Sequence, residues 1–234
     1  MTWLAIDTSG RRAAVALGGP GAVAVHAAVE GPRVHGARLL PLVDDLLARA
    51  GLTLGDVTDL ALTDGPGSFT GLRVGAAVAK ALVRTRGVAL HVAPALLAAA
   101  AEPLLAGGVV VSASDALRGE VYAGAWALVD RRLDTRLAPR AVAPTRLPGL
   151  LPRPAALVAG LPAALAAPLA AWAGEPVAPG DAAVGLLWLA AFPGILRPVP
   201  EPDAWEPDYG RPAEAQARWE AAHGRALPDP ARLG

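Results

Sequence analysis

The order of apolar segments in the first 93 residues is the feature that most restricts how this chain can fold. Three short apolar runs, at residues 2–7, 12–19 and 22–29, are separated by turn residues such as "GGPG". Runs of this length bounded by turn signals are typical of strands. Two more follow at 59–65 and 88–92, each preceded by a helical segment. The order β-β-β-α-β-α-β is therefore predicted by about residue 93.

The two helical segments carry apolar residues at helical spacing. In the first, over residues 35–51, Gly51 stands where a C-terminal cap belongs, and Pro41 is expected to bend the helix unless it falls in the first turn. The second, over 69–87, is expected to close at Gly87. The apolar face of the first helix consists of Leu39, Val43, Leu46 and Ala50.

A second αβ unit is predicted to begin near residue 104. The strand-like runs "VVVSASD" and "EVYAGAWALVD" follow there, and a short helix is expected in "PAEAQARWEAAHG". The segment 139–200 is so rich in Ala, Pro and Leu that the sequence does not predict the order of its helices and strands. We expect two domains, residues 1–103 and 104–234, the second with a polar tail.

Composition limits the possible functions. The 234 residues are 53% hydrophobic and 18% charged, which supplies enough apolar material for a buried core. Because 21 basic residues balance 21 acidic ones, no global positive field would attract nucleic acid. Cysteine is absent, which excludes disulfides, thiolate metal sites and cysteine nucleophiles.

Neither a signal peptide nor a membrane helix is expected. Asp7 interrupts the first apolar run, and no basic region precedes it. The uncharged stretch between Arg153 and Glu175 has about the length of a bilayer helix, roughly 20 residues, but Pro162 and Pro168 break it. We expect a buried αβ segment there and a cytoplasmic protein.

The glycine-rich stretch "DGPGSFTGLRVG" at residues 64–75 opens the second helix. A Walker A phosphate loop is excluded, because Leu72 rather than Lys follows Gly71. Ser68 or Thr70 could cap the helix, so a weaker anion site at its N-terminus remains possible.

The same helix carries a stripe of small residues. Gly71, Gly75 and Ala79 recur every four residues, with Ala76 beside them, and therefore lie on one side of the helix. Such a stripe lets another element approach closely. It faces either a partner helix or the chain's own sheet, and the spacing alone favours neither.

Polar residues at two strand ends are weak candidates for a nucleotide site. Asp7, Thr8 and Ser9 could present N–H groups and hydroxyls to a phosphate, but a capped turn explains them as well. Asp115 is a further acidic candidate, and an ion pair with Arg118 that closes the turn explains its position equally.

The histidines give no basis for a zinc site. No histidine is followed by another four residues later, so no helical pair can grip a metal. The four are His26, His35, His91 and His223.

Together, "LAIDTS", "HGARLLPLVDDLLARAG", "GPGSFTGLRVG" and "SDALRGEVY" resemble the TsaB (YeaZ) family, the non-catalytic subunit of the bacterial tRNA threonylcarbamoyladenosine machinery. The resemblance covers most of residues 1–129, and the later "EPDYGRP" is similar to the family's "P-x-Y-x-R" element, with Gly210 between Tyr209 and Arg211. It implies an α/β protein of the actin-like, Hsp70-like (ASKHA) fold, with two ribonuclease-H-like domains of which the second is reduced.

The resemblance also implies partners. They are the catalytic paralogue TsaD, the ATPase TsaE, a second copy when the chain is alone, and tRNA through the complex. No cofactor is implied for the isolated chain, whereas ATP or ADP can lie at the complex interface. The His-x-x-x-His metal pair of the catalytic paralogue has no counterpart in "LHVAPALLAAA".

The family's partner surface lies on its first two helices. Carried onto this sequence, it gives a predicted set of partner-binding residues: His35, Leu39, Leu42, Val43, Leu46, Gly67, Phe69, Gly71, Leu72, Val74, Gly75, Ala76 and Ala79. Two alternatives to a scaffold subunit stay open. One is an autonomous ATP-dependent phosphotransferase that uses Asp7, Thr8 and Ser9. The other is a glycoprotease, although the sequence contains no nucleophile elbow to support it.

Overall fold

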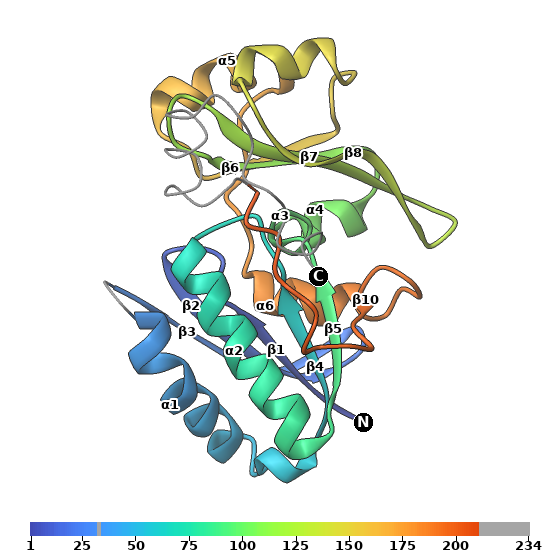
Figure 1. Ribbon diagram of the computed structural model, residues 1–234. Coiled ribbons are helices and arrows are strands. Elements are labelled where there is room, and N and C mark those ends of the chain that lie inside the picture. The colour runs from blue at the N-terminus through green and yellow to red at the C-terminus, as the bar shows by residue number, and fades with distance from the viewer. Residues whose placement is uncertain (32–33, 211–234) are drawn as a thin grey trace, which may run out of the picture.

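The computed structural model describes residues 1–31 and 34–210 of the chain. It contains two β-sheets, one above the other in Figure 1, with helices between them and on their outer faces. The helix predicted in "PAEAQARWEAAHG", together with Arg211 and His223, lies outside the described residues.

The larger sheet, sheet A, has six strands in the order β10-β5-β4-β1-β2-β3. Its first three strands form an antiparallel meander, β4 and β5 run parallel to β1, and the short β10 pairs with β5. The strands are β1 (Thr2–Asp7), β2 (Arg12–Gly19), β3 (Ala22–Glu30), β4 (Val57–Thr63), β5 (Ala89–Ala93) and β10 (Arg197–Pro198).

Two long helices cover one face of sheet A (Figure 1). They are α1 (Val34–Arg49) and α2 (Phe69–Arg86), and the short 3-10 helix η1 (Leu54–Asp56) precedes β4. The predicted order β-β-β-α-β-α-β is thus confirmed. Helix α1 runs on through Pro41, and Gly51 beyond its end has a left-handed φ of 67°.

Alternating side chains divide sheet A into two different faces. Leu4, Ile6 and the residues that share their face pack under α1 and α2 in one apolar cluster. Ala5 and other alanines on the opposite face form a second cluster with α6 (Ala182–Leu189). The period of two along each strand produces this division.

The smaller sheet, sheet B, repeats part of sheet A. Its order β8-β7-β6-β9 matches β3-β2-β1-β4, including the parallel pairing of its fourth strand. The strands are β6 (Val110–Asp115), β7 (Val121–Val129), β8 (Arg132–Val142) and β9 (Ala156–Ala159), and the outer face carries η2 (Pro144–Gly149) and α5 (Ala163–Ala173). The fold is therefore the expected actin-like α/β fold with a reduced second half.

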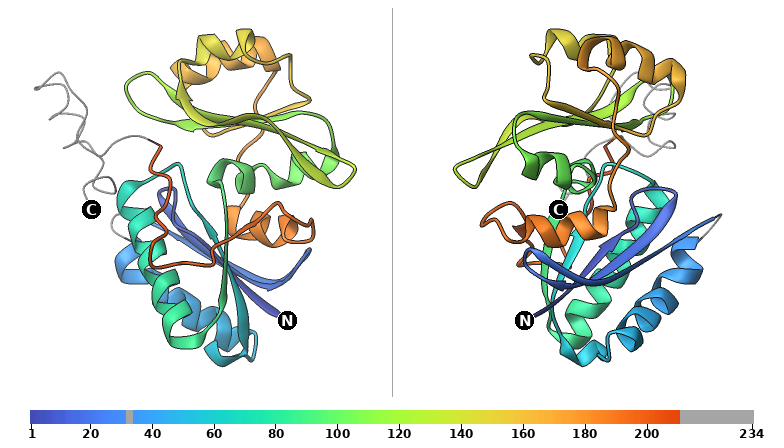
Figure 2. Two further views of the ribbon diagram at one scale, coloured as in Figure 1. Left: turned by 45° about the vertical axis from the view of Figure 1, so that its right-hand side comes forward. Right: turned by 180° about the vertical axis from the view of Figure 1, so that it is seen from behind.

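Three short helices lie between the sheets: α3 (Ala95–Ala99), α4 (Ala101–Ala106) and α6 (Figure 2). Helix α6 is apolar all round and is almost wholly buried against α3 and the back of sheet A. Its Gly185 touches the carbonyl of Ala98, an approach that a Cβ would prevent. The division at residues 103 and 104 stays a prediction, and the structure adds that α6 and β10 return to sheet A.

The uncharged stretch between Arg153 and Glu175 forms β9 and α5, so the αβ character is as expected. The expected burial holds for β9 but is wrong for α5, where Leu169 is the buried residue and most of the helix lies on the surface. Within residues 1–31 and 34–210, no helix has the length and apolar character needed to cross a membrane.

Candidate interaction surface and strand-end turn

Helix α2 is fixed at both ends by its own sequence. The Ser68 hydroxyl accepts from the Gly71 N–H at 3.2 Å, so the helix has a side-chain cap, and the Ser68 N–H donates to the Ser9 carbonyl at 2.6 Å. At the other end, Gly87 has φ of 67° and donates to the Val83 carbonyl at 2.8 Å. The predicted capping by Ser68 and closure at Gly87 are confirmed.

The stripe of small residues faces the chain itself. A Cβ on Gly71 would overlap the Thr8 carbonyl, and one on Gly75 would overlap the Thr8 hydroxyl. Gly67 lies in the same way against Ser9. The interpretation of this stripe as the seat of a partner helix is therefore corrected, because the segment after β1 already fills that space.

The turn after β1 encloses its own carboxylate. Asp7 is buried, and its Oδ1 accepts from the Ser9 N–H at 3.0 Å, the Ser9 hydroxyl at 2.6 Å and the Thr63 hydroxyl at 2.7 Å. The Thr8 hydroxyl beside it is buried and has no partner within the described residues. The capped turn is what the structure contains, and nucleotide binding by Asp7, Thr8 and Ser9 stays a prediction.

Asp115 ends β6, the strand of sheet B that corresponds to β1. Its Oδ1 accepts from the Leu117 N–H at 2.6 Å, inside a turn where Leu117 and Arg118 both have positive φ. The predicted ion pair with Arg118 does not occur among the described residues, because the backbone N–H takes its place. A nucleotide role for Asp115 also stays a prediction.

Most of the predicted partner-binding residues lie inside the fold. Because α1 and α2 turn their apolar faces to sheet A, the side that looked available for a partner packs on the chain's own core. These residues are His35, Leu39, Val43, Leu46, Gly71, Leu72, Gly75, Ala76 and Ala79. Their assignment as direct partner contacts is corrected, since buried residues can only position the surface above them.

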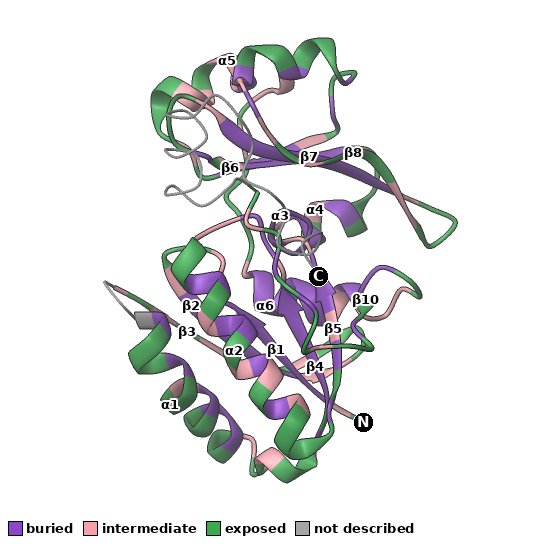
Figure 3. Cartoon of the chain, in the orientation of Figure 1, coloured by how far each residue is buried: buried purple, intermediate pink, exposed green. Residues whose placement is uncertain are grey.

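The outer face of the two helices is a different set of residues. Of the predicted residues, Leu42, Gly67 and Val74 are partly exposed and Phe69 is exposed. Sequence reasoning missed Leu40 of α1, whose relative exposure of 54% is large for a leucine. Figure 3 shows exposed segments along the outer side of both helices, and the small or apolar residues that are exposed on them include Ala37, Pro41, Ala77 and Ala81.

The loop before α2 holds a carboxylate that is largely removed from solvent. Asp64 is mostly buried, and burial raises its pKa above 3.8, while the hydrogen bond and charge of Arg197 at 3.0 Å act in the opposite direction. The described residues contain no cluster of three or more His, Cys, Asp or Glu side chains that could hold a metal ion.

Comparison with known proteins identifies the family. Residues 29–166, more than half of the chain, match the family described as TsaD: tRNA N6-adenosine threonylcarbamoyltransferase. The chain belongs to this family, in its TsaB (YeaZ) group. It is 38% identical over 133 residues to the tRNA threonylcarbamoyladenosine biosynthesis protein TsaB of Escherichia coli K12, which covers 56% of each chain.

A solved structure and a further relative are also similar to this chain. The structure of YeaZ from Pseudomonas aeruginosa has a TM-score of 0.70 and 29% identity, covering 89% of this chain and 99% of that one. A tRNA N6-adenosine threonylcarbamoyltransferase of Bordetella pertussis is 50% identical over 56 residues, 24% of this chain and 16% of that one. The chain spans about half the length of the curated TsaB relatives it matches.

In this member of the TsaB group, a C-terminal strap lies along α2, and sequence reasoning missed it. We define the strap as residues 200–210. Trp205 buries its ring among the apolar residues under α2, and the rings of Tyr209 and Phe69 lie 4.7 Å apart.

Two ion pairs join the strap to the outer side of α2. Glu206 pairs with Lys80 at 3.0 Å and Asp203 pairs with Arg84 at 2.8 Å. The strap supplies only the acids of these pairs and α2 only the bases. It therefore forms one edge of the outer face of the two helices.

Proposed function

We propose that this chain is a non-catalytic subunit of the machinery that installs N6-threonylcarbamoyl on adenosine 37 of tRNAs reading ANN codons. It acts by binding a catalytic, TsaD-type relative through the outer face of α1 and α2. Membership of the TsaB group supports the pathway. The exposure of Leu40, a large apolar side chain on the outer side of α1, is the observation that supports this choice of surface.

The chemistry of this face suits a helical partner. Ala77 and Ala81 on α2 and Ala37 on α1 are short exposed side chains that leave room for a partner at these positions, and Leu40 supplies an apolar anchor. The same face pairs two copies when the catalytic relative is absent. In this proposal the ATPase TsaE joins the heterodimer, tRNA binds through the complex, and the assembly works in the cytoplasm.

We also propose that the isolated chain binds no nucleotide and that ATP or ADP binds only at the interface of the complex. The engagement of Asp7 Oδ1 by three donors of its own chain supports this, since those groups are turned inward. Calorimetry with ATP tests it: heat with the complex and none with either subunit is expected. Micromolar binding by the isolated chain would instead favour an autonomous phosphotransferase.

Light scattering on a sizing column tests the partnership. The chain is mixed with the TsaD-type protein of the same genome, as wild type, as Leu40→Arg and as the control Leu150→Arg, an exposed leucine (43%) beside sheet B. A 1:1 complex with wild type and the control, lost in Leu40→Arg, is the expected result. Without the partner, wild type should run at about twice its 23.6 kDa mass.

The other results separate the two parts of the proposal. If Leu40→Arg still forms the complex, the surface assignment is wrong and the subunit function stands. If wild type forms no complex at all, the proposed function itself is wrong.

A further inference from the structure

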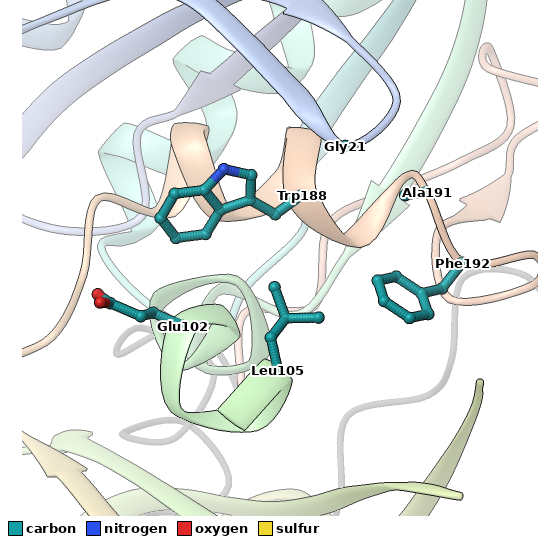
Figure 4. Close-up of a pocket in the computed structure, with 6 residues that line it drawn as sticks. All are labelled: Gly21, Glu102, Leu105, Trp188, Ala191 and Phe192. Carbon is teal, nitrogen blue, oxygen red and sulfur yellow. The ribbon is translucent and has the colours of Figure 1, made fainter. Parts of the chain in front are cut away.

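A pocket of about 450 Å³ lies where α4 and α6 meet the turn between β2 and β3 (Figure 4). It is far from the outer face of α1 and α2, and nothing in the proposed function uses it. Its lining residues are Gly21, Glu102, Leu105, Trp188, Ala191 and Phe192. Its volume is in the range of small-molecule sites, roughly 300–1,000 Å³.

The walls of the pocket are apolar and are held in place. The Gly21 N–H donates to the Leu187 carbonyl at 2.7 Å, which ties the β2–β3 turn to α6. Arg131 donates to the Ala191 carbonyl at 3.4 Å, and its guanidinium lies 4.8 Å from the ring centre of Phe192. These contacts fix the β2–β3 turn and the segment around Phe192 on two sides of the pocket.

One carboxylate stands at the edge of this apolar space. Glu102 is exposed, and no ion pair in the described part of the chain involves it. Figure 4 places it at the opposite end of the pocket from Phe192, with Trp188 and Leu105 between them. The Arg131 guanidinium beside Phe192 makes that end unfavourable for a second cation, so a positive group would lie at the Glu102 end.

We propose that this pocket binds a small organic ammonium ion with an apolar or aromatic body. The ammonium pairs with the Glu102 carboxylate, and the apolar body packs on Trp188 and Leu105. An aromatic face near a cation also gives favourable electrostatics. This inference is independent of the proposed function, since it rests on none of the partner surface.

The test uses three probes of similar shape that differ in charge: phenethylammonium, 2-phenylethanol and 3-phenylpropanoate. Calorimetry and ligand-observed NMR with the full chain measure their affinities. Because the ion pair is partly exposed, the ammonium should bind about fivefold more tightly than the alcohol, and the carboxylate should bind most weakly.

Variants assign the effect to the pocket. Glu102→Gln should reduce the ammonium to the affinity of the alcohol, and Leu105→Trp, at a position 40% exposed, should fill the pocket and abolish binding of both. The controls Glu175→Gln and Leu117→Trp change exposed residues elsewhere and should leave binding intact. No ammonium binding, equal affinity for the three probes, or unchanged binding in either pocket variant would overturn the proposal.

Discussion

Gly75 of α2 lies directly against the side-chain hydroxyl of Thr8, the residue that follows β1. One turn earlier, Gly71 lies in the same way against the Thr8 carbonyl. The absence of side chains on this part of α2 is therefore a requirement of the chain's own packing. A substitution such as Gly75→Arg would disturb the folded chain as well as any partner, so it cannot report on pairing alone.

Gly71→Ala should destabilise the chain by about 1–3 kcal/mol, because the new Cβ overlaps a backbone oxygen that cannot rotate away. Helix propensity alone predicts a gain of about 0.5–1 kcal/mol for the same change, so the two effects have opposite signs. Urea unfolding measures the result. Gly36→Ala on α1, where nothing lies within 4 Å of the new Cβ, is the control and should gain stability. Equal gains in both variants would contradict the packing account.

Thr63→Val should cost about 1–3 kcal/mol, because it removes a hydroxyl donor from the buried Asp7 carboxylate while keeping a similar shape. Thr63→Ser keeps the hydroxyl and loses only a methyl group, so it should recover much of the loss. Comparing the free energies of unfolding of the two variants is the measurement. A Ser variant that is less stable than the Val variant would show that the methyl group, rather than the hydrogen bond, matters at this position.

Trp205→Ala should release the strap, at a cost of about 3–5 kcal/mol for a large buried ring. Asp203→Ala removes only an exposed ion pair with Arg84 and should cost less than about 1 kcal/mol. Urea unfolding gives the stabilities, and limited proteolysis reports whether residues 200–210 have become accessible. Strong proteolysis of Asp203→Ala, with Trp205→Ala resistant, would mean that charge and not the buried ring holds the strap.

Asp64→Asn should stabilise the chain at pH 7, with the advantage shrinking as the pH falls. Burial raises the pKa of Asp64 in the folded state, so its ionised form lowers the stability of the folded chain. This loss of stability is absent below pH 3.8 and grows as the pH rises from 3.8 through the folded pKa. Urea midpoints at pH 7, 5 and 3.5 measure this dependence.

Asp56→Asn supplies the opposite case. Hydrogen bonds from the Thr53 hydroxyl and N–H lower the pKa of Asp56, so its ionised form contributes stability above pH 3.8 that is lost as the pH falls through the folded pKa. This variant should be the less stable one at pH 7, and its deficit should close in acid. Parallel pH profiles for the two variants would refute the assignment of opposite shifts.

The seven elements of the order β-β-β-α-β-α-β could be predicted because the strands are short apolar runs bounded by turn residues. Helix α1 has a distinct apolar side, on which Leu39, Val43 and Leu46 are buried. Helices α5 and α6 have no such side, since they are apolar all round, so periodicity gave no signal in the Ala-rich segment.

The partner surface was harder to predict for a physical reason. An apolar helix face looks the same in sequence whether it packs on its own sheet or on another molecule, and Leu39 and Val43 proved to be core residues. Leu40, one position along, lies outside that periodic set and is the exposed residue. The strap was not predictable either, since its contact from Asp203 to Arg84 joins residues 119 positions apart.

The return of α6 to the back of sheet A affects how this chain can be made. Its leucines cover the alanine face of β1 and β2, so that face remains open until residues 182–189 have left the ribosome. Sheet B lies earlier in the sequence and needs none of these residues for its own outer core. During translation, the part synthesised first therefore completes its packing last, and a chain that stops before α6 carries an exposed apolar sheet face prone to aggregation.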